Sequence, residues 1–88
     1  MPYKNLNEIA IKVYQELQNA DEKYVTVENK KERIVEIEIM YMKETRPASP
    51  RFRIVTEKGT VLFLTPSKFL QKRYIIIKDG KEKMIIGQ

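Results

Sequence analysis

Arginine is concentrated in one short segment, Arg46-Pro-Ala-Ser-Pro-Arg51-Phe52-Arg53. Its two prolines stiffen the chain, because each ring fixes the backbone φ angle and removes an N–H donor. The planar guanidinium groups match phosphate oxygens and also stack on bases. The segment therefore indicates a surface that contacts an anion. A set of solvated arginines that keeps a sheet edge soluble would show the same residue pattern.

A second basic group consists of Lys68, Lys72 and Arg73 and lies just after Thr65-Pro66-Ser67. A threonine cap followed by a proline at the first helical position predicts a helix of about one turn. Lysines beside this turn would contact phosphates without reading a base sequence. The first N–H groups of the turn, at Ser67 and Lys68, are a further place where we expect an anion to bind.

Aromatic and acidic residues complete the candidates. We expect Phe69 and Tyr74 to stack on bases, whereas the other strand aromatics occupy apolar-facing positions and are predicted core residues. Glu36 and Glu38 are two residues apart on a predicted strand, so their side chains share a face. Two carboxylates without a histidine or a third oxygen ligand make a weak cation site, so we expect cross-strand pairs with Lys or Arg.

The composition argues against catalysis. The chain has no histidine and no cysteine, which removes the commonest general base, thiolate metal sites and disulfides. Its three glycines form no phosphate-binding loop. A nuclease built from Lys, Arg and Tyr is chemically feasible but leaves no spacing signature. We therefore expect a protein that is not an enzyme and that carries no cofactor or metal.

Positive charge is unevenly distributed along the 88 residues. Residues 1–45 have a net charge of −2 and residues 46–88 have a net charge of +7, which together give the +5 of the whole chain. A local excess of like charge creates a potential that attracts polyanions. The second half is therefore predicted to face an anionic partner.

The elements that must position these residues begin with a helix from Asn5 to about Lys23. Asn5 followed by Glu8 has the spacing of a capping box. Apolar residues then recur at three- and four-residue steps and form one face of a helix. They are Leu6, Ile9, Ala10, Val13, Leu17 and Ala20.

Strands occupy the rest of the chain. Strict alternation in the longest one predicts that Val35 and Ile37 face the helix and that Ile34 faces away. If Phe52 also faces the helix, the pleat sends Arg51 and Arg53 to the other face. Asp79-Gly80 favours a type I′ hairpin turn. The predicted strands are Tyr24–Val27, Arg33–Lys43, Arg51–Thr56, Thr60–Thr65, Arg73–Lys78 and Glu82–Ile86.

This order predicts one α+β domain over residues 1–88, with an N-terminal amphipathic helix on a strongly bent antiparallel meander of about five or six strands. The last strands are apolar on both faces, which is typical of strands buried on two sides. One helix covers one face only. The second face must be covered by closure into a barrel or by another subunit, and we expect a homo-oligomer, mostly a dimer.

These observations favour a small basic protein that binds DNA or RNA through the phosphate backbone, with weak sequence specificity, as a dimer. The alternative is a non-enzymatic interaction or regulatory module that oligomerises through its apolar strands and binds an acidic protein. No apolar run reaches the roughly 18–20 residues of a membrane span, and no signal peptide is apparent, so a cytoplasmic location is expected. The predicted phosphate contacts are Arg46, Arg51, Arg53, Lys68, Lys72 and Arg73.

Overall fold

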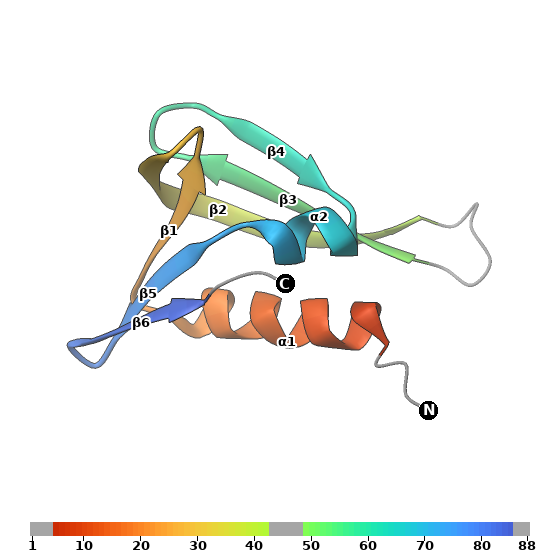
Figure 1. Ribbon diagram of the computed structural model, residues 1–88, viewed down its shortest axis with the longest axis horizontal. Coiled ribbons are helices and arrows are strands. Elements are labelled where there is room, and N and C mark those ends of the chain that lie inside the picture. Colours follow the sequence, from red (N-terminus) through yellow and green to blue (C-terminus); the bar gives the residue numbers. More distant parts are fainter. Residues whose placement is uncertain (1–4, 43–48, 86–88) are drawn as a thin grey trace.

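The computed structural model describes residues 5–42 and 49–85 and has the α+β architecture that the sequence predicts (Figure 1). The Asp79-Gly80 hairpin is confirmed, because both residues have positive φ angles of 52° and 77°. The elements are α1 (Leu6–Asn19), β1 (Glu22–Val27), β2 (Lys30–Met42), β3 (Ser49–Thr56), β4 (Val61–Leu64), α2 (Pro66–Gln71), β5 (Tyr74–Lys78) and β6 (Lys81–Ile85).

Helix α1 begins where the capping pattern predicts. The Asn5 side chain accepts a hydrogen bond from the Asn7 N–H at 2.9 Å, which satisfies one of the donors at the start of the helix. The predicted end near Lys23 is wrong, because α1 ends at Asn19. Lys23 instead pairs with Ile76 of β5, so sheet hydrogen bonds replace the last helical turn.

The six strands form one open antiparallel sheet in the order β4-β3-β2-β1-β5-β6. Strands β1 to β4 are a meander, and α2 then carries the chain to the free side of β1, where β5 pairs. The first part of β2 pairs with β1 and the rest pairs with β3, so the sheet bends into two wings (Figure 1). Because β4 and β6 are the two edges, barrel closure is not how this sheet covers its second face.

A β-bulge in β2 reverses the predicted facing of two residues. Ile34 pairs with Thr56 and Glu36 with Val55, which leaves Val35 as an extra residue. Ile34 is therefore buried at 5% exposure, whereas Val35 is 58% exposed. Strict alternation had predicted the reverse, and it holds only beyond the bulge, where Ile37 and Ile39 face the interior.

Both helices cover the same side of the sheet, here called the inner face; the opposite side is the outer face. An aromatic row holds this layer together. Tyr14 of α1 lies 6.0 Å from Phe52 of β3, measured between ring centroids. Phe52 stacks on Phe69 of α2 at 4.1 Å, and Phe69 lies 5.2 Å from Tyr74 of β5. Four elements thus meet in one row, with α2 between α1 and β3 (Figure 1).

One carboxylate is buried on the inner face. Glu32 of β2 is 8% exposed, and the Thr56 hydroxyl donates a hydrogen bond of 2.7 Å to its Oε1 atom. Hydrogen bonds from Thr56 and Thr60 favour the ionised form and hold the pKa of Glu32 below its ordinary value. The long strand β2 is thereby tied to the turn between β3 and β4.

Phe52→Ala is expected to lower the free energy of unfolding by about 3–5 kcal/mol, because it removes the centre of the aromatic row and leaves a cavity. Urea denaturation measures this change. Tyr41→Ala is the control, since Tyr41 is 56% exposed and its truncation should change the free energy of unfolding by less than about 0.5 kcal/mol. Equal effects of the two substitutions would contradict a central role for Phe52.

Glu32→Gln tests the buried carboxylate through pH. Because the pKa is lower in the folded chain, ionised Glu32 stabilises the fold above its unfolded pKa, and this contribution is lost as the pH falls through the folded pKa. The melting temperature of the wild type should exceed that of Glu32→Gln most at pH 7, and the gap should shrink below about pH 4. The exposed control Glu82→Gln should show no such gap, and a gap independent of pH would refute the assignment.

Candidate nucleic-acid interface

The arginines of the proline-rich segment lie on the outer face, as predicted from the pleat. Arg51 pairs with Met40 and Arg53 with Glu38 across β2 and β3, so all four side chains share that face. Arg46 lies outside the described residues. The sequence therefore placed these two side chains on the correct face, and the structure shows which groups each of them contacts.

Arg53 is held by two carboxylates. Its Nη1 atom lies 2.7 Å from Glu36 and 2.8 Å from Glu38, which confirms the predicted cross-strand pairing of these glutamates. Hydrogen bonds and charge from Glu36 raise the pKa of Arg53, with a smaller effect from Glu38. Arg51 donates to Ser49 Oγ at 2.6 Å and to the Pro50 carbonyl at 3.0 Å. Two arginines beside two glutamates leave no excess of positive charge on this part of the face.

The predicted stacking residues are core residues, which corrects that prediction. Phe69 is 0% exposed and Tyr74 is 1% exposed. The Tyr74 hydroxyl donates a buried hydrogen bond of 2.6 Å to the Phe69 carbonyl, and burial raises the pKa of the phenol. Neither ring presents a face to a base, because both are occupied by the aromatic row.

The second basic group is brought to a corner of the molecule. Lys72 and Arg73 connect α2 to β5, and the Arg73 carbonyl accepts a hydrogen bond of 3.0 Å from the Thr26 N–H of β1. This bond places the connection beside the β1–β2 turn. A hollow of about 350 Å³ lies between the two segments. Its lining residues are Thr26, Glu28, Asn29, Gln71, Lys72 and Arg73.

Two further lysines follow the β1–β2 turn, and neither is among the phosphate contacts predicted from the sequence. The turn itself is confined to Glu28-Asn29, with φ angles of 49° and 66°. Lys30 and Lys31 begin β2 and are exposed. Lys31 pairs with Thr26, whose N–H donates to the Arg73 carbonyl, so the three form a row across β2, β1 and the connection that leads into β5. We call Lys30, Lys31, Lys72 and Arg73 the basic corner.

Cations outnumber carboxylates in the lining of this hollow, where Lys72 and Arg73 accompany Glu28. Lys68 is exposed on α2, one helical turn before Lys72. A half-buried aromatic ring adjoins the corner, because the Lys31 Nζ atom lies 4.8 Å from the centroid of Tyr24. A hydrogen bond of 2.7 Å to Glu22 holds the Tyr24 hydroxyl and raises its pKa.

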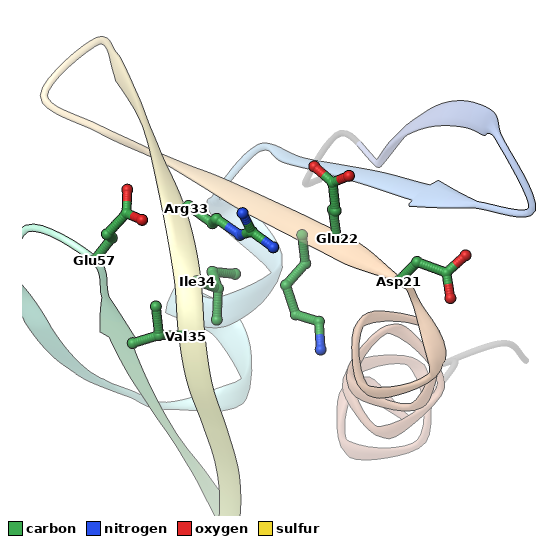
Figure 2. A pocket seen from close by; sticks show the side chains of 7 residues that line it. Asp21, Glu22, Arg33, Ile34, Val35 and Glu57 are labelled. Atoms are coloured by element: carbon green, nitrogen blue, oxygen red, sulfur yellow. The ribbon is translucent and has the colours of Figure 1, made fainter.

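The predicted anion site at the start of α2 is partly occupied by the chain itself, and a second hollow has mixed charge. The Lys68 N–H at the start of α2 already donates to Thr65 Oγ1 at 3.3 Å. A second hollow, between the start of β1 and β2, has mixed charge, because Asp21, Glu22 and Glu57 line it together with two cations (Figure 2). Figure 2 shows Arg33 extending from β2 into this hollow, where the three carboxylates outnumber the cations.

The described residues contain no cluster of three acidic side chains able to hold a metal ion. Neither helix within residues 5–42 and 49–85 is long and apolar enough to cross a membrane. Lys30, Lys31, Lys72 and Arg73 of the basic corner carry positive charge and N–H donors, which are the groups that contact anions.

Fold and site together define a small α+β protein that has an open antiparallel sheet, two helices on one face and a basic corner. No family model and no solved structure matches the chain. "Uncharacterized protein 2" of Sulfolobus islandicus filamentous virus (isolate Iceland/Hveragerdi) is 51% identical over 82 residues, covering 93% of this chain and 96% of the viral protein. The chain belongs to the family of that viral protein.

Tyr74→Phe separates a core role from a stacking role. It removes the buried hydrogen bond to the Phe69 carbonyl, so the free energy of unfolding should fall by about 1 kcal/mol. The affinity for nucleic acid, measured by fluorescence anisotropy, should equal that of the wild type, because the ring is buried. A loss of affinity without a loss of stability would restore the stacking role.

Proposed function

We propose that this protein binds the phosphate backbone of nucleic acid through the basic corner, with weak sequence specificity. The observation that carries the proposal is the convergence of segments 30–31 and 72–73. Lys72 and Arg73 line one hollow, and Lys30 and Lys31 directly follow Glu28 and Asn29, which line its other side. These segments are about 40 residues apart in the sequence and meet because β5 pairs with β1. A surplus of cations around a concave surface raises the local concentration of a polyanion.

The dimensions of the basic corner suit a nucleic-acid strand. Neighbouring strands lie about 5 Å apart, so Lys31 and Arg73, on either side of Thr26, have backbones about 10 Å apart. One strand of a duplex advances about 3.4 Å along the helix axis per phosphate, so cations this far apart can contact different phosphates of the same strand. The side chains of Asn29 and Gln71 line the hollow and belong to the residue types that donate to phosphate and sugar oxygens.

The weak specificity follows from the residue types. Lysine and arginine contacts to phosphate determine the position of the ligand but read no base directly. Tyr24 is the aromatic residue that adjoins the corner, and its contact with Lys31 leaves it half-buried. A sequence-tolerant stacking contact is the one base contact that such a ring supports.

The alternative, an interaction module that binds an acidic protein, is favoured by the exposed apolar residues of the outer face. Val61 and Phe63 are 58% and 56% exposed. An acidic polypeptide carries carboxylates instead of phosphates and would be attracted to the same corner. Titration with polyglutamate beside DNA and RNA distinguishes the two hypotheses, because tighter binding of polyglutamate would favour the acidic protein.

Lys31→Gln/Arg73→Gln should weaken binding of fluorescent single-stranded DNA, duplex DNA and RNA about tenfold or more at ~50 mM salt. The slope of log affinity against log salt should become shallower by about one to two, because one or two phosphate contacts are lost. Anisotropy titrations at ~50 and ~200 mM salt measure both quantities. The control, Lys12→Gln/Lys81→Gln, removes the same charge from exposed positions on α1 and β6.

The control should retain most of the affinity and the wild-type salt dependence. Equal losses in the two double variants would mean that net charge, not the corner, attracts the ligand. If Arg51→Ala/Arg53→Ala were the more damaging change, the interface would lie on the outer face. Failure of the wild type to bind any of the three nucleic acids at ~50 mM salt would refute the proposed function.

A further inference from the structure

The two edges of the sheet differ in their protection against pairing. Edge strand β6 contains Lys81, Glu82 and Lys83, and charged residues on an edge discourage the addition of another strand. Edge strand β4 is Val61-Leu62-Phe63-Leu64, with no charge, no proline and no bulge in its pairing with β3. We propose that β4 is a dimerisation edge that pairs antiparallel with β4 of a second copy of this chain.

The backbone of β4 is oriented for this pairing. The Thr56 N–H donates to the Thr60 carbonyl at 2.9 Å, which is one of the two bonds of a hydrogen-bonded pair, and the Thr60 N–H donates to Thr56 Oγ1 at 3.2 Å. Such pairs alternate along an antiparallel ladder, so Leu62 and Leu64 bond to β3, whereas the N–H and C=O groups of Val61 and Phe63 point away from it. These outward groups are a template for a further strand.

A two-fold axis at Leu62 lets the outward backbone groups of both β4 strands form hydrogen bonds with each other. Val61 of each copy then lies opposite Phe63 of the other, and the two residues exchange backbone hydrogen bonds. Their side chains, now more than half exposed, become cross-strand neighbours on the outer face. An aromatic residue opposite a β-branched residue is a favourable cross-strand pair. The pairing therefore uses the backbone and the apolar side chains of the same residues.

Charge favours a second copy at this edge. Two chains of net charge +5 repel each other, so they associate most readily where the local charge is balanced. Arg53, opposite Phe63 in the β3–β4 register, is bound to Glu36 and Glu38, and Arg51 lies on the same face. Two cations beside two anions leave this surface without net charge, so it does not repel its own copy.

The paired segment is only four residues long, so its area lies at the low end for a specific interface and we expect reversible association in the micromolar range. Sedimentation equilibrium from about 1 to 500 μM should show the mass rising from 10.5 kDa towards twice that value. A wild type that remains a monomer throughout this range would overturn the proposal.

Phe63→Lys should weaken dimerisation at least tenfold, because it places a charge on each copy beside the two-fold axis. Met84→Lys is the matched control, since Met84 lies on the same face at the β6 edge and is 55% exposed, against 56% for Phe63. It should dimerise as the wild type does. Loss of the dimer in the control, or its retention in Phe63→Lys, would contradict the proposed edge.

A second variant tests the same edge in case Phe63→Lys does not fold. Val61→Pro removes one outward N–H, and proline is tolerated on an edge strand when its missing donor faces solvent. It should give a folded monomer by circular dichroism. In the wild type, amide exchange at Val61 and Phe63 should slow as concentration rises. A dimer without this protection would indicate packing through the outer face and would refute strand pairing.

Discussion

The aromatic row from Tyr14 through Phe52 and Phe69 to Tyr74 is the constraint on which the rest of the structure depends. It joins α1, β3, α2 and β5, and α1 and β3 are far from the other two elements in the sequence. The short helix α2 would not be stable alone, because a helix of six residues forms too few hydrogen bonds to offset its ordering. Its ring at Phe69 anchors it to the inner face, and the chain can then cross from β4 to the far side of β1.

This crossover creates the basic corner as a by-product of packing. Because α2 is anchored, the residues that follow it enter β5 beside β1. The hydrogen bond from the Thr26 N–H to the Arg73 carbonyl joins this connection to the end of β1. Lysines at the start of β2 then lie near lysine and arginine of the α2–β5 connection. Within the described residues, the same packing places both helices on the inner face. On the outer face, Arg53 is paired with Glu36 and Glu38.

Most of the fold was predictable because it rests on local rules. Periodicity located α1, turn residues located the hairpins, and alternation placed Arg51 and Arg53 on one face with Glu38. Two predictions failed for non-local reasons. The bulge at Val35 is a response to pairing with β3, and the end of α1 is determined by pairing of β1 with β5. The residues around Val35 and at the end of α1 carry no sequence signal that identifies the strand with which they pair.

The sequence by itself determined the element types and the positive charge of the second half, since both depend on residue type and short-range spacing. The tertiary structure decided which charges act together. It paired Arg53 with two glutamates, enclosed Phe69 and Tyr74, and brought Lys31 to the row that contains Arg73. The physical reason is that strand order depends on how side chains pack between elements, and that packing joins residues whose separation along the chain carries no signal.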